Sequence, residues 1–199
     1  MPAQPNSYLA EMARFSDGAE HAVRRAAVLS VLPPVSGLED AAYRCTRHLL
    51  SERVDVVPIA RSVPVAVLCH ALGLGDLSTE IGALCDIGTT ATTLPQVAIT
   101  SLLFQCRDAT AALATNAIAD GIPVEKAVSV VLTRRAGDVW VLLDRAPFGE
   151  GAHACPGREH ALALARGIVR AFSGYRVVQR GAHEPRPNIR MLSSLIVER

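Results

Sequence analysis

Aromatic side chains and lysine are scarce in this sequence. Phe, Trp and Tyr make up 4% of the 199 residues and Lys126 is the one lysine, although half of the residues are hydrophobic. A core built from this chain therefore consists mainly of Ala, Val and Leu. The 20 basic and 19 acidic residues nearly balance. No basic tail or stripe stands out, which excludes the charge pattern of a nucleic-acid-binding protein.

Paired cysteines are also lacking. The five cysteines show no C-x-x-C spacing, which argues against a zinc site and a disulfide framework, and their odd number fits a reducing cytoplasm. No apolar run is long enough to cross a bilayer, and residues 1–17 lack the apolar region of a signal peptide. We therefore expect a cytoplasmic protein without a membrane partner. A single domain over residues 1–199 accounts for this length.

Helical periodicity covers most of residues 1–120. Helices are predicted over Tyr8–Phe15, Ala19–Leu32, Gly37–Leu50, Asp55–Gly75 and Val97–Ala119. A glycine and a proline at 121–123 end the longest of them. In the second helix, His21 and Arg25 are four residues apart and share a face. Taken alone, these two residues indicate a solvated basic face.

The last third of the chain contains strand patterns. Valine-rich runs at Val124–Val131 and Val139–Leu143, separated by a turn-rich segment, predict a pair of strands. A strong helix is predicted over Gly157–Phe172, and Tyr175–Gln179 is a strand candidate. The predicted fold is mainly α with a small β component.

One stretch directly before the last helix concentrates residues suited to chemistry, Phe148-Gly149-Glu150-Gly151-Ala152-His153-Ala154-Cys155-Pro156-Gly157. Glycines permit positive φ and close approach to a flat ligand, and Pro156 suits the first turn of a helix. Cys155 is therefore expected near a helix N-terminus, where free N–H groups and the macrodipole favour a thiolate. These features make Cys155 a candidate metal ligand or nucleophile.

Two other interpretations apply to the same residues. The first is a structural turn that holds a small buried cysteine. The second is a dinucleotide loop, because Gly149, Gly151 and Ala154 satisfy G-x-G-x-x-A. Five residues separate this pattern from the run Val139–Leu143, and no βαβ unit surrounds it, so the tight strand-to-helix turn of that loop is missing.

At every defined position the stretch resembles the haem-binding loop of the cytochrome P450 family, F-G-x-G-x-H-x-C-x-G. The resemblance implies that Cys155 is the axial thiolate of the iron of haem b, within a loop shaped by Gly149 and Gly157. It also implies that Phe148 packs against the sulfur and that His153 reaches a haem propionate. A thiolate ligand pushes electron density onto iron and favours O–O cleavage.

Further segments resemble the same family. The pattern D-G-x-E-H-x-x-x-R, which ends at Arg25, is similar to the C-helix entry of bacterial cytochromes P450 and implies that His21 and Arg25 hold haem propionates. Ala161, one turn into the helix after the cysteine loop, allows close approach to the macrocycle or, equally, close helix packing. Residues 105–112 resemble the central helix that crosses the distal face of haem.

The match in that central helix is imperfect. In the family an acid followed directly by a threonine relays protons to dioxygen, whereas here Ala109 separates Asp108 from Thr110. Adjacent residues on a helix point about 100° apart, whereas residues two apart, such as Asp108 and Thr110, point about 200° apart. One of the two is therefore expected to face away from the iron. Alternatively, Asp108 pairs with an arginine in the core and Thr110 bonds its own backbone.

The resemblance implies a compact haem-thiolate fold in which residues 1–120 supply the helical part and residues 121–199 supply the strand pair, cysteine loop, proximal helix and hairpin. Full-length family members are longer and carry an E-x-x-R helix, a meander and substrate-covering helices. These parts have no clear counterpart in this sequence. The resemblance therefore covers most of the chain, in the family's order, with internal deletions.

The implied activity is that of an oxidoreductase of the monooxygenase or peroxygenase type acting on a small organic substrate, with specialised metabolism as one setting. No flavin or nicotinamide site is visible, so electrons are expected from a ferredoxin and its reductase, unless hydrogen peroxide replaces them. The displaced acid and threonine favour peroxide. The alternative is a non-catalytic relative that assists a complete enzyme or pairs as a homodimer, because an apolar groove without its cover favours association.

Overall fold

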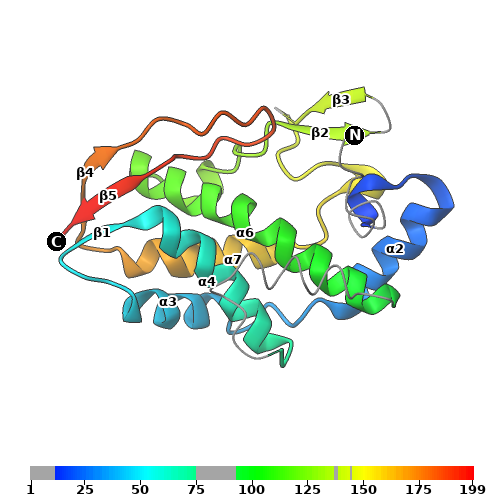
Figure 1. Cartoon of the computed structure of the whole chain (residues 1–199), viewed down its shortest axis with the longest axis horizontal. Helices are drawn as coiled ribbons and strands as arrows, with labels where there is room; N and C mark the ends of the chain where they lie inside the picture. The colour runs from blue at the N-terminus through cyan, green and yellow to red at the C-terminus, as the bar shows by residue number, and fades with distance from the viewer. Residues whose placement is uncertain (1–11, 75–92, 137–138, 144) are drawn as a thin grey trace, which may run out of the picture.

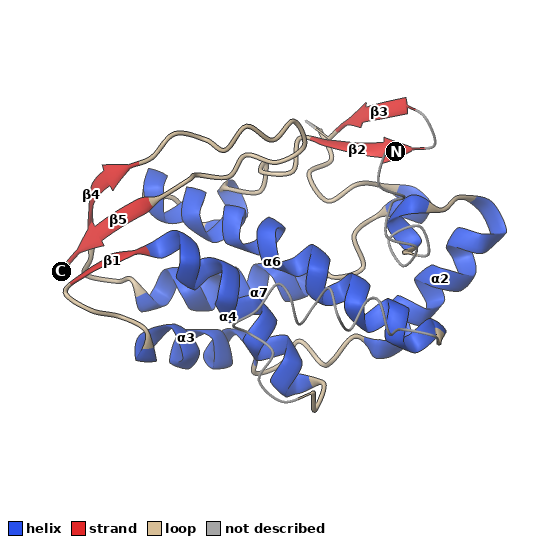
Figure 2. Ribbon diagram, in the orientation of Figure 1, coloured by secondary structure: helices blue, strands red, loops and turns tan. Residues whose placement is uncertain are grey.

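The computed structural model describes residues 12–74, 93–136, 139–143 and 145–199, and most of them are helical (Figures 1 and 2). Along the chain the elements are η1 (Ala13–Phe15), α2 (Gly18–Val31), α3 (Leu38–His48), β1 (Arg53–Asp55), α4 (Val56–Ala71), α6 (Leu94–Asp120), η2 (Val124–Lys126), β2 (Thr133–Ala136), β3 (Val139–Leu142), η3 (Gly151–His153), α7 (Arg158–Ala171), β4 (Arg176–Arg180) and β5 (Leu195–Glu198). The expected mainly α fold with a small β component is confirmed. The first half of the helix predicted over Tyr8–Phe15 lies outside the described residues, and its described end is the short η1.

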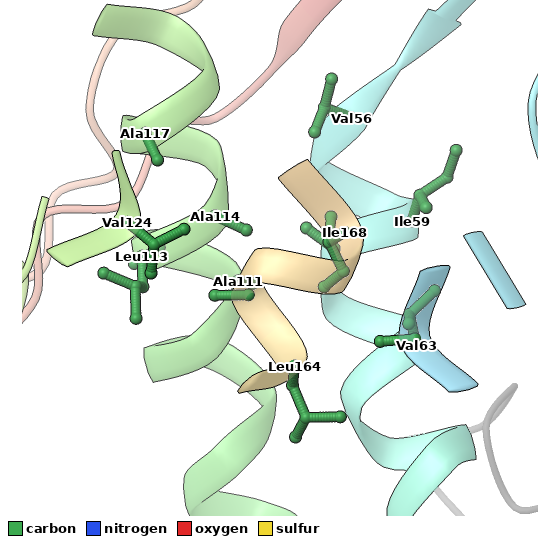
Figure 3. Packing of buried hydrophobic residues seen from close by; sticks show 14 of the residues in the cluster. Val56, Ile59, Val63, Ala111, Leu113, Ala114, Ala117, Val124, Leu164 and Ile168 are labelled. Atoms are coloured by element: carbon green, nitrogen blue, oxygen red, sulfur yellow. The ribbon is translucent and has the colours of Figure 1, made fainter. Parts of the chain in front are cut away.

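Four helices, α3, α4, α6 and α7, form the core of the molecule. Figure 3 shows Leu164 and Ile168 of α7 lying between α4 and α6, with Val63 of α4 on one side and Ala111 of α6 on the other. The core is built from aliphatic residues, as the composition predicts. Buried alanines on α6 let its neighbours come close, since a methyl side chain adds little bulk.

Helix α6 is the longest element and crosses the centre of Figure 1. It starts with a capping box, in which the Thr93 N–H donates to Gln96 Oε1 at 3.1 Å, and Pro95 lies in the first turn. It ends at Gly121, whose φ of 62° is left-handed. These local signals place both ends within a few residues of the predicted bounds.

The C-terminal hairpin belongs to an antiparallel sheet with the order β1-β5-β4. Strand β1 has no counterpart among the strands predicted from the sequence. Asp55 joins this sheet to the core, because its Oδ1 accepts from the Leu195 N–H and from the Val57 N–H, both at 3.0 Å. The second of these bonds caps α4. The sheet lies at the opposite end of the molecule from α2 (Figure 1).

The predicted strand over Val124–Val131 is wrong. This segment begins with the short η2 and continues as a loop, and only a single bridge, between Val131 and Ile189, pairs it with another segment. Val124 and Val130 are buried in the helical core, so packing explains their apolar character without a strand. The hairpin itself exists, but its first strand is β2, which pairs with β3.

Helices α3 and α7 approach each other closely. A Cβ added at Gly167 of α7 would lie 2.2 Å from the Glu39 carbonyl oxygen, so only glycine fits there. Beside this contact, Arg166 of α7 bonds Glu39 at 2.9 Å and Glu125 of η2 at 3.0 Å. Arg170, one turn further along α7, adds a bond to Asp40 at 2.6 Å. These contacts hold the helix that follows the cysteine loop.

Candidate functional site

The cysteine stretch folds into a closed loop. The Cys155 N–H donates to the Phe148 carbonyl at 2.7 Å, and the Gly149 N–H donates to the Ala146 carbonyl at 2.7 Å. Gly149 has a φ of 71°, and a Cβ there would lie 3.0 Å from the carbonyl oxygen of His153. A glycine is therefore required where the loop folds back on itself.

Cys155 precedes α7 by more residues than the sequence indicates. The helix begins at Arg158, with Gly157 as its N-cap, so Pro156 lies before the first turn instead of within it. Desolvation by the surrounding walls raises the pKa of the Cys155 thiol, although the Gly157 N–H and the charge of Arg25 act to lower it. Desolvation therefore opposes the thiolate that the helix end is expected to favour.

Helix α2 holds the cysteine loop from the side. Arg25 Nη1 donates to the carbonyl of Ala154, the residue before the cysteine, at 2.6 Å. The rings of His21 and His153 have centroids 4.0 Å apart, and His153 Nε2 is 3.3 Å from Asp17 Oδ1. These contacts join two segments that are more than a hundred residues apart in sequence.

The solvated basic face suggested by the sequence is wrong for α2. His21 is only 5% exposed, whereas Val23 and Leu29 are 58% and 52% exposed. His21 and Arg25 therefore face the cysteine loop and the cavity, whereas Val23 and Leu29 face outward. This orientation agrees with the role that the resemblance implies for His21 and Arg25.

A cavity of about 270 Å³ lies between the cysteine loop, α2, α6 and the start of α7. Nine of the ten residues singled out from the sequence line it. They are His21, Arg25, Thr110, Phe148, Gly149, His153, Cys155, Gly157 and Ala161. Cys155 is exposed, which contradicts the interpretation as a small buried structural cysteine. The tertiary fold thus gathers residues from three distant segments around one space.

Helix α6 forms the wall opposite the cysteine loop. Its lining residues follow helical spacing and are Leu102, Gln105, Cys106, Ala109, Thr110 and Leu113. Thr110 is fully buried, and its hydroxyl has no hydrogen-bond partner among the described residues. The alternative in which Thr110 bonds its own backbone is therefore wrong. Thr110 thus lines the cavity with a buried hydroxyl that no described residue bonds.

Asp108 does not line the cavity. Its carboxylate binds Arg61 of α4 at 3.1 Å, Arg107 at 2.6 Å and also Arg186, and Glu184 completes the group through Arg61 at 2.8 Å. Partial burial raises the pKa of Asp108, but the bond from Arg186 and the charges of the three arginines outweigh this effect and lower it overall. The pairing with arginine is thus the interpretation that holds for Asp108. Of the two residues expected to point apart, Asp108 is therefore the one that faces away, and Ala109 shares the cavity face with Thr110.

Three further cavity residues were missed by the sequence interpretation. Gln105 and Cys106 lie one turn before Ala109 and Thr110, so helical spacing alone signals them. Burial raises the pKa of the Cys106 thiol, which keeps it neutral. His160 is 8% exposed; one ring nitrogen, Nε2, lies 2.7 Å from the Pro33 carbonyl, and Nδ1 has no partner among the described residues.

Other classes of site find no support in the described part of the chain. Its strands form antiparallel pairs, so the βαβ unit of a dinucleotide loop is missing there. No group of three or more His, Cys, Asp or Glu residues is placed to hold a metal ion among the residues described. Within the same residues, no helix combines the length and apolar character needed to span a bilayer.

Comparison with known proteins identifies the fold. No protein-family model matches the sequence, and no curated protein is significantly similar to it. Among solved structures, the substrate-free form of a Mycobacterium marinum cytochrome P450 matches with a TM-score of 0.73 at 16% identity, spanning 94% of this chain and 76% of that one. A cytochrome P450 from Chondromyces apiculatus matches with a TM-score of 0.72 at 14% identity, spanning 100% and 82%.

Two more structures agree with these. A Bacillus subtilis cytochrome P450 matches with a TM-score of 0.68 at 15% identity, spanning 97% of this chain and 87% of that one. A structure of unusual P450-like monooxygenases involved in microbial secondary metabolism matches with a TM-score of 0.70 at 12% identity, spanning 100% and 85%. Identities this low establish the architecture and leave the activity to the site. The chain has a compact cytochrome P450-like fold.

Proposed function

We propose that this chain binds haem b in the cavity through the Cys155 thiolate and acts as a haem-thiolate oxidoreductase on a small organic molecule. The observation that carries the proposal is the cavity itself. Cys155, in its closed loop, lies on one wall, and the stripe of α6 that contains Thr110 lies on another. The cytochrome P450-like fold supports the same assignment.

The residues present fit haem. The Cys155 sulfur is the kind of ligand that iron takes, and a cation at that position would stabilise the thiolate against the raised pKa of the free thiol. Arg25, His21 and His153 form a polar group beside the loop that suits the carboxylates of a propionate-bearing macrocycle. Ala161 adds a small side chain to the wall, which leaves room for a flat ligand.

In this proposal Arg25 and Thr110 have separate roles. Haem bound through a thiolate supplies oxygen activation and oxygen-atom transfer. Arg25 holds the loop through the Ala154 carbonyl and so fixes the position of the cysteine. The Thr110 hydroxyl, which lacks a protein partner among the described residues, can hold or pass a proton at the α6 wall.

Hydrogen peroxide is the oxidant that this arrangement favours. A proton relay beside Thr110 needs an acid on the same helix face, and Ala109 occupies that position while Asp108 is engaged by three arginines. Peroxide already carries the protons and electrons that dioxygen would need, so it depends less on such a relay. A ferredoxin and its reductase are the competing source of electrons. We place the substrate, by analogy with the neighbour from microbial secondary metabolism, among small organic molecules of specialised metabolism.

A second candidate function is that of an auxiliary protein that associates with a complete enzyme or with a second copy of itself. The outward face of α2 favours it, because Val23 and Leu29 are more than half exposed. This candidate and the enzyme differ in one requirement, since an auxiliary protein needs no haem. Size-exclusion chromatography at several concentrations measures the self-association.

The deciding experiment is haemin titration of the purified full chain, followed by the carbon monoxide difference spectrum of the reduced protein. We expect stoichiometric uptake and a thiolate-type spectrum that Cys155→Ala abolishes. Cys106→Ala, which removes the other cavity cysteine, is the matched control and should keep that spectrum. A chain that takes up no haemin, or a Cys155→Ala variant with an unchanged spectrum, would refute the proposal. Turnover with hydrogen peroxide, compared with turnover on ferredoxin and its reductase, then separates the two oxidants.

A further inference from the structure

We propose that Gln105 selects the substrate of this site, by accepting a hydrogen bond from a neutral hydroxyl or amide N–H on an otherwise apolar molecule. The inference rests on the proposed function, because it names the class of substrate for the same cavity. It concerns a residue on α6 to which the resemblance and the sequence patterns gave no role.

The orientation of the Gln105 amide is fixed by Ser101, one turn earlier on α6. Its Nε2 lies 3.2 Å from the Ser101 carbonyl oxygen and 2.6 Å from Ser101 Oγ. A carbonyl oxygen only accepts hydrogen bonds, so the amide nitrogen and not the amide oxygen must face it. Both hydrogens of the amide are used in this way.

The oxygen Oε1 is the group that remains for a ligand. It accepts no hydrogen bond from the described residues, and Gln105 lines the cavity. On a helical projection Gln105 lies at one edge of the lining stripe of α6, about 140° from Thr110 at the other edge. Leu102, Ala109 and Leu113 lie between these edges, so a substrate meets an apolar surface with a single acceptor on the Gln105 side.

The charge of the cavity decides which donors are suitable. Arg14 and Arg25 line it, whereas no Asp or Glu does so among the described residues. On the Gln105 side of the cavity a cationic amine would find no Asp or Glu to pair with among the described residues, and its desolvation would cost free energy. A neutral hydroxyl or amide N–H bonds to Oε1 without that cost. A substrate without any donor would leave the acceptor desolvated and unpaired.

The test uses two isomers that differ in their ability to donate, 1-octanol and heptyl methyl ether. Isothermal titration calorimetry on the haem-loaded full chain measures both dissociation constants. We expect the wild-type protein to bind the alcohol about three- to tenfold more tightly than the ether, the range for one net hydrogen bond. Gln105→Met, which keeps the length and removes the oxygen, should abolish the preference.

Two more variants complete the experiment. Phe104→Leu changes the neighbouring residue, which does not line the cavity, and should keep the preference. Ser101→Ala removes one acceptor that orients the amide, so the preference should shrink; this variant decides the matter if Gln105→Met does not fold. Equal binding of both isomers by the wild-type protein, or an unchanged preference in a folded Gln105→Met, would overturn the inference. Haem uptake is measured separately on the same samples, so failure of the proposed function is distinguishable from failure of this inference.

Discussion

The two halves of α7 differ in how completely they are packed. The C-terminal half contacts α3 so closely that Gly167 leaves no space for a methyl group, and Arg166 and Arg170 add bonds to acidic partners. In the N-terminal half, a Cβ added at Gly157 would meet nothing within 4 Å, and His160 keeps an unpartnered ring nitrogen. One helix thus carries a closed interface at one end and part of the cavity at the other.

This difference shows where the fold tolerates unsatisfied groups. A buried polar atom without a partner costs about 1–3 kcal/mol, and Thr110 and His160 both line the cavity. The tightly packed half of the core supplies the stability that offsets such costs. The unsatisfied atoms found among the described residues therefore belong to side chains that border the cavity, not to the tightly packed half of the core.

The largest effect is expected for Gly167→Ala. Because the new methyl group would overlap the Glu39 carbonyl oxygen, α3 must move, and we expect a loss of about 3 kcal/mol in the free energy of unfolding. The matched control is Gly157→Ala at the N-cap of the same helix, where space is open, with an expected loss under about 1 kcal/mol. Urea unfolding of both variants measures the contrast. Equal losses of unfolding free energy in the two variants would contradict the difference in packing between the two ends of α7.

Asp108→Asn is expected to lower the free energy of unfolding by about 2 kcal/mol at pH 7, because it leaves three arginines without their shared carboxylate. The pKa of Asp108 is lowered in the folded protein. Its stabilisation is therefore fully present above the unfolded pKa of about 3.9 and is lost as the pH falls through the lower folded value. Thermal melts from pH 7 down to pH 2 should show wild type and variant converging.

The control for this prediction is Asp40→Asn. Asp40 also has a lowered pKa, caused first by its hydrogen bond with Arg170, but it lies on the surface. Its replacement should cost less than that of Asp108, since solvent screens exposed pairs. A larger loss for Asp40 than for Asp108 would contradict the view that the three arginines around Asp108 are structural.

Arg25→Met tests how α2 holds the cysteine loop. Losing the bond to the Ala154 carbonyl should let the loop open more often, so we expect the Cys155 amide to exchange its hydrogen about tenfold faster in the haem-free protein. Arg24→Met, at the adjacent position on α2, should leave this exchange rate unchanged. Hydrogen exchange read by NMR resolves the single amide. An unchanged rate in Arg25→Met would mean that the loop closes by its own bonds alone.

Thr110→Val should produce the smallest change and one of opposite sign. It replaces an unpartnered buried hydroxyl by a methyl group, so the haem-free protein should gain about 1 kcal/mol in the free energy of unfolding. Thr115 is the matched control, because its buried hydroxyl bonds the Ala111 carbonyl at 2.9 Å. Thr115→Val should be neutral or destabilising in the same urea experiment. A loss in Thr110→Val would show that its hydroxyl has a partner in the folded chain.

Much of this architecture follows from local signals. The capping box at Thr93, the glycine at 121 and the loop glycine at 149 act through their own backbone and nearest neighbours, so patterns in the sequence locate them. The valines of 124–131 show the opposite case. A buried loop and a strand have the same composition, and only the neighbouring helices decide between them.

In the candidate site, too, local sequence patterns predict some features and only the tertiary structure decides others. Spacing alone predicts that Asp108 and Thr110 cannot share a helix face, but not which of them faces the cavity. Arg61 and Arg186, which come from other segments, settle that question for Asp108 together with the neighbouring Arg107. Helical spacing places Gln105 on the same face of α6 as Ala109, but its role becomes visible only once a cavity and an orienting serine lie beside it.

The sequence by itself determined the helices, the loop from Phe148 to Gly157 and the cysteine on which the proposed chemistry depends, since these rest on local conformational preferences and on one dense motif. The tertiary structure alone decided that His21 turns inward while Val23 turns outward. It also decided that the C-terminal half of α7 packs tightly against α3, whereas space is open beside its N-cap. Those outcomes depend on which surfaces meet across long sequence separations, and burial is a property of the whole fold rather than of any segment.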